Sequence, residues 1–204
     1  MRSQTRIQGQ DLLATCPDTV LAVDLDGTLI QTDMLRRGVA QILRTAPLSM
    51  FGLVLTLLRQ GRPGFKQAVA GIATSRPADL PYNPHVVALA RSWRAAGRKV
   101  ALATAADETV AQSVAAHLGI FDAVHASTVG RNLKGRAKAA FLVQEYGDRG
   151  FVYVGDSKAD LHVWKHAAGA AIACDSPKVM ARLLRLGVPV QSVAMRNKDA
   201  DEHG

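Results

Sequence analysis

The chain has 204 residues, of which 48% are hydrophobic and 21% are charged, and its formal net charge is +8. Such a composition excludes a disordered chain, and the length suffices for one substantial core with a small accessory domain. The two cysteines, Cys16 and Cys174, are far apart in the sequence, which argues against a disulfide framework. We expect neither a signal peptide nor an apolar run of the roughly 18 to 20 residues that span a bilayer. We therefore predict a cytoplasmic protein.

The first predicted element is an apolar strand over residues 20–23 that ends in two carboxylates. Asp24 and Asp26 are followed at once by Gly27 and Thr28, which form a turn. A buried strand bounded by a turn signal is expected here, and open α/β sheets place ligand sites at the carboxyl ends of their strands. Residues two apart share a face of a strand, so both acids can reach one small volume, one as nucleophile and one as proton donor. The alternative is a strand that ends in a solvated acidic turn.

A helical insert is predicted over residues 33–82. Asp33 can cap a first helix, Pro47 can open a second, and the Pro-rich stretch 77–84 is typical of a linker. All charged residues between Asp33 and Asp79 are basic. A region of one sign attracts anions such as phosphorylated substrates, acidic lipid surfaces or nucleic acid, although it could also be a basic surface that only aids solubility. Scarce aromatic residues in the insert argue against nucleic acid.

The insert also contains an uncharged, largely apolar segment over residues 45–58. As a helix it would be about 20 Å long, which is too short to cross a bilayer. It could lie on a bilayer surface or line a pocket for a lipid tail. We favour the alternative that it packs against the core, other helices or a second subunit.

Strands and helices alternate from Pro84 onward. An alternation of this kind implies a parallel sheet that is covered on both faces by helices. We therefore predict an α/β fold with a core formed by residues 1–32 and 83–204, and a cap formed by residues 33–82. The predicted strands cover 99–104, 123–127, 151–155, 170–174 and 188–193, and the predicted helices 86–96, 107–118, 135–146, 158–167 and 177–186.

Polar residues follow several of these strands. Thr104 and the amides of the next turn would suit phosphate oxygens, although Thr104 could merely cap the following helix. Lys134, just before a helix, could offset the repulsion between a phosphoryl group and the carboxylates, with Lys138 one turn later as its rival. Asp156 and Asp160 offer the oxygen ligands that Mg²⁺ prefers, although Asp156 could instead cap a helix.

Taken in order, these segments resemble the four motifs of haloacid dehalogenase-like (HAD) hydrolases. The resemblance covers roughly residues 18 to 194 and includes a helical cap of the C1 type. Within that superfamily the chain is most similar to the phosphatase-like domain found fused to UbiA-type polyprenyl transferases, or alone beside them. Four segments carry this narrower resemblance: residues 81–83, 102–105, 132–135 and 155–164.

The resemblance implies a Rossmann-like parallel sheet with the cap inserted after the first strand, and it implies roles for the motif residues. Asp24 would attack phosphorus and form an aspartyl-phosphate, while Asp26 would protonate the leaving oxygen and then deprotonate the attacking water. Phosphate would be bound by Thr104, Lys134, Gly27 and Thr28. Mg²⁺ would be held by Asp24, the backbone carbonyl of Asp26, and Asp156, with Asp160 supporting the metal shell.

We therefore expect a Mg²⁺-dependent phosphomonoesterase. Its substrate would be a sugar phosphate or another small phosphorylated molecule, or a lipid-linked polyprenyl phosphate reached by peripheral membrane contact through the cap. A dehalogenase acting on carbon needs no acid at position 26, so Asp26 favours phosphate chemistry. The alternatives are a phosphotransferase or mutase on the same fold, and a non-catalytic module that docks on a membrane or a partner.

Overall fold

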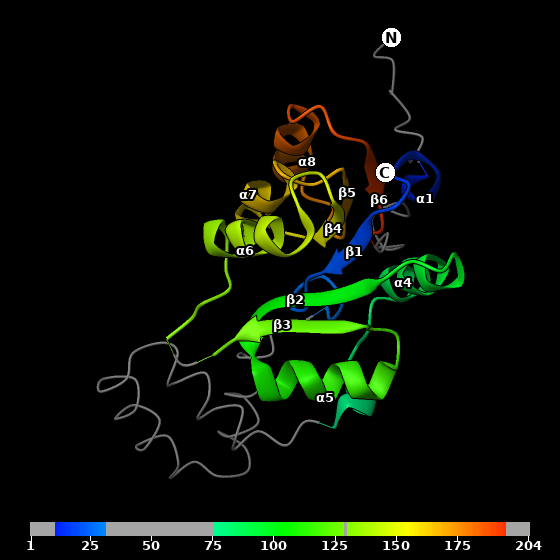
Figure 1. Cartoon of the computed structure of the whole chain (residues 1–204), viewed down its shortest axis with the longest axis vertical. Coiled ribbons are helices and arrows are strands. Elements are labelled where there is room, and N and C mark those ends of the chain that lie inside the picture. The colour runs from blue at the N-terminus through cyan, green and yellow to red at the C-terminus, as the bar shows by residue number, and fades with distance from the viewer. Residues whose placement is uncertain (1–10, 32–75, 129, 195–204) are drawn as a thin grey trace, which may run out of the picture.

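The computed structural model describes residues 11–31, 76–128 and 130–194, so most of the predicted cap lies outside the described residues. One six-stranded, fully parallel sheet forms the centre, in the order β3-β2-β1-β4-β5-β6 (Figure 1). The predicted α/β fold with a parallel sheet is confirmed. The strands are β1 Val20–Val23, β2 Val100–Asp107, β3 Ala123–Ser127, β4 Phe151–Gly155, β5 Gly169–Ile172 and β6 Val190–Ser192.

Helices cover both faces of this sheet. One face packs against α1 (Leu12–Thr15), α4 (Pro84–Ala95) and α5 (Glu108–Leu118). The other packs against α6 (Arg136–Tyr146), α7 (Leu161–Trp164) and α8 (Pro177–Leu184). Two short 3₁₀ helices, η1 (Pro77–Asp79) and η2 (Lys158–Asp160), complete the described elements. Within the described ranges, no helix is both long and apolar enough to cross a lipid bilayer.

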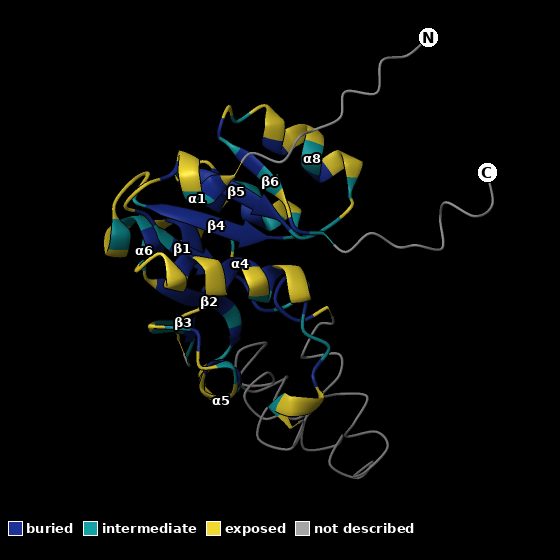
Figure 2. Cartoon of the chain, turned by 90° about the vertical axis from the view of Figure 1, so that its right-hand side faces the viewer, coloured by how far each residue is buried: buried dark blue, intermediate teal, exposed yellow. Residues whose placement is uncertain are grey.

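The central strands are buried on both faces, as the dark interior of Figure 2 shows. In β4, Val152 and Val154 face the α4 side, whereas Phe151 and Tyr153 face the α6 side. This alternation follows from the two-residue period of a strand. A continuous apolar run is therefore the pattern that a doubly covered parallel strand requires.

Side-chain caps set the ends of the flanking helices. Asp107 caps α5 by accepting a hydrogen bond from the Thr109 amide at 2.9 Å, and Gly119 ends that helix at a φ of +62°. Sequence analysis did not predict α1, a single turn capped by Asp11 that fully buries Leu12. One turn is too short to show a helical period.

Most predicted boundaries lie within two residues of the structure, and two differ by more. β2 continues to Asp107 instead of ending at residue 104, because its pairing with β3 shifts register between Ala103 and Asp107. The helix predicted over 158–167 is divided into η2 and α7, which ends at Trp164. Tight 3₁₀ turns of this kind are common at helix starts and leave little trace in the sequence.

The chain positions on either side of the undescribed segment 32–75 lie next to each other. Ile30 and Tyr82 form an antiparallel bridge, and the Gln31 amide donates a hydrogen bond to the Pro81 carbonyl at 3.1 Å. Leu80 is only 6% exposed and belongs to the core. The last residues of the predicted insert are thus attached to the sheet domain.

Candidate active site

The candidate site lies where the connectivity of the sheet reverses direction. From β1 the chain proceeds outward to β2 and β3, and β4 then returns to the other side of β1. Val23 and Val154 are register partners, and the Asp24 amide donates to the Val154 carbonyl at 3.0 Å. Asp24 and Asp156 therefore follow adjacent strands at one edge. Such a switch point is where open α/β sheets bind ligands.

Three carboxylates meet at this edge. Oxygen atoms of Asp24, Asp156 and Asp160 all lie within 4.8 Å of one another. Burial raises the pKa of Asp24 to about 7, with Lys138 opposing the shift and Asp160 adding to it. Burial and then Asp160 raise the pKa of Asp156 to about 6. Crowded, buried acids resist ionisation, and a hard divalent cation with oxygen ligands would offset that resistance, so these residues fit such an ion.

Asp160 holds the loop that carries Asp156. Its Oδ2 accepts hydrogen bonds from the Ser157 hydroxyl at 2.7 Å, the Ser157 amide at 2.9 Å and the Asp156 amide at 3.2 Å. Its Oδ1 accepts from the Tyr153 hydroxyl at 2.9 Å. A carboxylate has about four lone-pair positions, so Asp160 retains little capacity for another ligand. This arrangement favours the supporting role predicted for Asp160, with Asp24 and Asp156 as the acids available to a cation.

Gly27 and Thr28 shape the loop after β1. Gly27 has a φ of +79°, and a Cβ placed there would lie 2.4 Å from Oδ2 of Asp156, so only glycine fits. Its amide donates to the Ile30 carbonyl at 2.8 Å. Thr28 is fully buried, and its hydroxyl donates to Oδ1 of Asp156 at 3.5 Å. These contacts shape the loop after β1, and the phosphate-binding role predicted for both residues stays a prediction.

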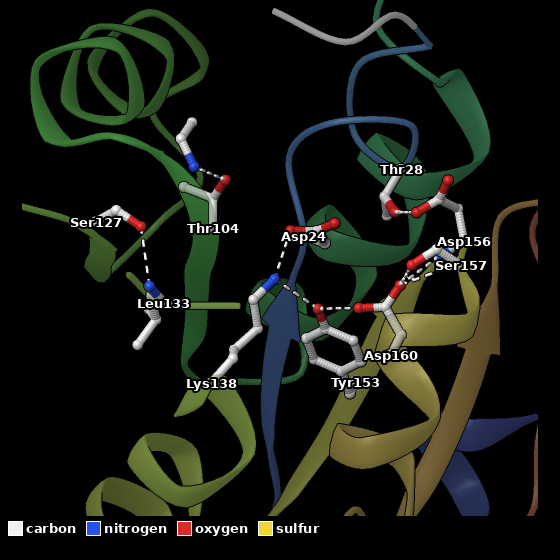
Figure 3. A network of polar contacts seen from close by, with 11 residues as sticks. Asp24, Thr28, Thr104, Ser127, Leu133, Lys138, Tyr153, Asp156, Ser157 and Asp160 are labelled. Carbon is white, nitrogen blue, oxygen red and sulfur yellow. Dashed lines mark hydrogen bonds and ion pairs between the residues drawn. The ribbon is translucent and has the colours of Figure 1, made fainter. Parts of the chain in front are cut away.

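Lys138, the rival of Lys134 in the sequence, is the lysine that reaches the acids. It lies in the first turn of α6, is only 3% exposed, and donates from Nζ to Oδ1 of Asp24 at 2.7 Å (Figure 3). Lys134, which the sequence analysis placed as the phosphate-binding lysine, is exposed in the loop before α6, whereas Lys138 is the lysine that contacts Asp24. The signal for Lys138 was available, because it shares a helix face with the buried Leu142 four residues later.

Tyr153 is a site residue that sequence analysis missed. Its ring is fully buried on β4 and packs edge-on against Trp164. Its hydroxyl accepts from Lys138 Nζ at 2.9 Å and donates to Asp160. Burial, followed by the charges of Asp160 and Asp24, raises the pKa of Tyr153 well above its ordinary value, so the hydroxyl keeps its proton. In the sequence, a tyrosine within an apolar strand cannot be distinguished from an ordinary buried aromatic residue, which is why Tyr153 was missed.

Thr104 and Asp26 complete the predicted set. Thr104 is fully buried in β2, on the opposite side of Asp24 from Asp156 in Figure 3, and its hydroxyl accepts from the Ala106 amide at 2.9 Å. Since Asp107 caps α5, Thr104 does not serve as the helix cap. Asp26 is partly exposed in the loop after β1, and its charge contributes to the raised pKa of Asp24.

The fold and this arrangement define a class of protein. Residues 21–165 match the family model of haloacid dehalogenase-like hydrolases, and the chain belongs to this family.

Particular relatives were found by sequence and by structure. The chain is 38% identical over 174 residues to the uncharacterized protein y4nM of Sinorhizobium fredii, a match that covers 85% of this chain and 33% of the relative, so the chain spans about one third of that protein. Its fold is similar to phosphoserine phosphatase in the apo form, with a TM-score of 0.59, 15% identity and coverage of 88% of this chain and 94% of the other.

Two further solved structures share the fold. A phospho-aspartyl intermediate analogue of phosphoserine phosphatase has a TM-score of 0.58 at 14% identity and covers 90% of this chain and 96% of its own. The hydrolase t0658 of Salmonella enterica serovar Typhi has a TM-score of 0.58 at 14% identity, over 80% of this chain and 65% of its own. At these identities the structural likeness establishes the fold alone.

Proposed function

We propose that the chain is a Mg²⁺-dependent phosphomonoesterase that acts through an aspartyl-phosphate on Asp24. One observation carries the proposal: a buried lysine nitrogen lies 2.7 Å from Oδ1 of Asp24, inside a cluster of three acids. A phosphoryl group entering a purely acidic site would be repelled. Lys138 supplies the fixed positive charge that lets the anionic group approach its nucleophile.

In the proposed first half-reaction, a carboxylate oxygen of Asp24 attacks phosphorus. The bond from phosphorus to the ester oxygen breaks, and that oxygen takes a proton from the carboxyl of Asp26. In the second half-reaction, water attacks the phosphorus of the aspartyl-phosphate and gives a proton to Asp26. The bond from phosphorus to Asp24 then breaks, so inorganic phosphate leaves and both acids return to their starting states.

Asp24 and Asp156 would hold Mg²⁺, together with the backbone carbonyl of Asp26. The bound ion would neutralise charge on the acids and on the transferred group, which is the main demand of phosphoryl transfer. Asp160 would keep the loop that carries Asp156 in place through its contacts with both amides of that loop. Thr104 would donate its hydroxyl proton to a phosphoryl oxygen.

For the substrate we propose a small sugar phosphate or a lipid-linked phosphate, the latter from the basic and apolar sequence of residues 33–82. The narrower resemblance to domains associated with polyprenyl transferases supports the lipid-linked option. The match covers only one third of the y4nM protein, as expected if this domain also occurs fused to other domains.

The test is a panel of phosphate esters assayed for free phosphate with Mg²⁺ and with a chelator. The panel should contain p-nitrophenyl phosphate, sugar phosphates, phosphoserine and a polyprenyl phosphate in detergent or liposomes. We expect Mg²⁺-dependent phosphate release, and an acid-quenched phosphoprotein that hydroxylamine cleaves. A phosphorylated acceptor in place of free phosphate would instead establish a transferase or mutase, and no turnover of any ester would support the docking module.

A further inference from the structure

The hydroxyl of Tyr153 connects the two oppositely charged parts of the candidate site. It accepts a hydrogen bond from Lys138 Nζ at 2.9 Å and donates one to Oδ1 of Asp160 at 2.9 Å (Figure 3). Lys138 in turn contacts Asp24, and Asp160 holds the loop of Asp156. A single buried hydroxyl therefore lies between the nucleophile's lysine and the acidic loop.

The direction of these hydrogen bonds is fixed by chemistry. A lysine ammonium can only donate, and an ionised carboxylate can only accept. A phenol hydroxyl has one proton and two lone pairs, so Tyr153 must accept from Lys138 and donate to Asp160. Phenylalanine could fill the same ring volume and make neither bond.

Lys138 has an unusual location for a cation. It lies in the first turn of α6, where the helix dipole is positive, and it is almost fully buried. Both conditions disfavour a positive charge unless anions and acceptors compensate for them. The carboxylate of Asp24 and the hydroxyl of Tyr153 provide two such partners for the three N–H groups of the ammonium. Among the described residues the third N–H of this ammonium has no acceptor, so we expect it to donate to a phosphoryl oxygen.

The ring of Tyr153 is held in place by close packing. Its ring packs edge-on against Trp164, and a Cβ added at Gly155 would lie 2.8 Å from its Cε1 atom. The hydroxyl thus stays at a fixed place relative to β4. The lysine side chain, by contrast, has four rotatable carbons and no rigidity of its own.

We propose that Tyr153 is a positioning residue for phosphoryl transfer: its hydroxyl holds the Lys138 nitrogen at the angle needed for the transferred group, and holds the 156–160 loop in register with it. The proposal rests on the phosphatase function proposed above. Without the hydroxyl, Lys138 keeps its ion pair with Asp24 but loses its second fixed contact. Lys138 would then stabilise the resting enzyme more than it stabilises the transition state.

The test compares Tyr153→Phe with Tyr146→Phe. Tyr146 lies at the end of α6 opposite Lys138, and its hydroxyl makes one partly buried hydrogen bond, to His125 at 2.6 Å. We expect Tyr153→Phe to lower kcat by about 10- to 100-fold, the usual loss when a group that orients a site residue is removed, with KM changed far less. Tyr146→Phe should keep the wild-type kcat.

Two further readouts separate positioning from a general loss of structure. Inhibition by orthovanadate, a mimic of the transition state, should weaken about as much as kcat in Tyr153→Phe, whereas inhibition by inorganic phosphate should stay near the wild-type value. Mg²⁺ binding, measured by calorimetry, should weaken, because the 156–160 loop loses one contact. Below their unfolding transitions, both variants should have the circular dichroism spectrum of the wild type.

Several outcomes would overturn the inference. A wild-type kcat in Tyr153→Phe would do so while leaving the proposed function intact, and so would equal weakening of vanadate and phosphate. If Tyr153→Phe fails to fold, 4-aminophenylalanine at position 153, whose amino group takes the place of the hydroxyl, should keep part of the wild-type vanadate affinity, and its failure to do so overturns the inference. A wild-type chain that hydrolyses no phosphate ester would refute the proposed function and this inference with it.

Discussion

The two faces of the sheet differ in a way that identifies the functional one. On the face covered by α1, α4 and α5, Leu21, Val152 and Val154 belong to a large cluster of buried apolar side chains. The face covered by α6, α7 and α8 is just as buried, yet its polar residues Lys138, Tyr153 and Asp160 form one hydrogen-bonded network near the strand ends. Burial of charge is expensive unless it is paired, so such a network indicates a purpose other than stability.

The largest effect should come from replacing Asp24, the proposed nucleophile. We expect Asp24→Asn to lower turnover of p-nitrophenyl phosphate by at least about a thousandfold, because an amide cannot form the covalent intermediate. The variant keeps the size of the side chain, so its circular dichroism spectrum should match that of the wild type. Substantial residual turnover in purified Asp24→Asn would contradict the assigned nucleophile.

The next largest loss of turnover should come from replacing Lys138, and it should distinguish the two candidate lysines. Lys138→Met should reduce kcat by about 100- to 1,000-fold, the usual loss on removal of one preorganised donor to a developing charge. Lys134→Met is the matched control, since Lys134 is exposed, and we expect its kcat within about twofold of the wild type, as is usual for surface substitutions. The reverse ranking of the two variants in steady-state kinetics would restore the lysine that sequence analysis placed first.

The acidic cluster predicts a pH dependence of stability in metal-free protein. The pKa of Asp24 rises from 3.8 to about 7 on folding, and that of Asp156 from 3.8 to about 6. Between about pH 4 and pH 7 the folded state therefore binds protons that the unfolded state has released, so the free energy of unfolding falls as pH rises through this window.

Mg²⁺ should reverse this loss, because it binds the ionised carboxylates. We expect the increase in unfolding temperature on adding Mg²⁺ to be several degrees at about pH 8 and to fade towards about pH 5. Differential scanning calorimetry with a chelator and with Mg²⁺ measures both trends. A metal-free unfolding temperature that rises steadily from pH 5 to pH 8, or that has the same slope in Asp24→Asn, would show that these acids do not control it.

The smallest effect on turnover should come from the apolar face. Leu21→Ala removes a fully buried side chain near the start of β1 and should lower the free energy of unfolding by about 2 to 5 kcal/mol. Urea denaturation measures that loss. Turnover per folded molecule, measured well below the unfolding transition, should equal that of the wild type, and a large fall in kcat would mean that the two faces are coupled.

Much of this fold could be predicted from the sequence because its strands are short apolar runs with turn signals at both ends. The acids also could be placed, since Asp24 and Asp156 each follow such a strand directly. The lysine and the tyrosine could not be ranked in the same way. Whether Lys134 or Lys138 reaches Asp24 depends on the residue at which α6 begins. Helix ends are the least certain part of a prediction from sequence.

Tyr153 illustrates a different obstacle. Its position in β4 follows from the strand period, but the partners of its hydroxyl come from α6, which precedes β4, and from η2, which follows it. Such partners depend on how helices dock on the sheet. Local sequence carries almost no information about that packing.

The bridge between Ile30 and Tyr82 has an evolutionary consequence. It brings the two chain positions that flank the intervening segment together on the sheet domain. Because the entropy of closing a loop grows only logarithmically, doubling such a segment costs only about 0.6 kcal/mol. A lineage can therefore vary the length of this segment at little cost to the stability of the sheet domain.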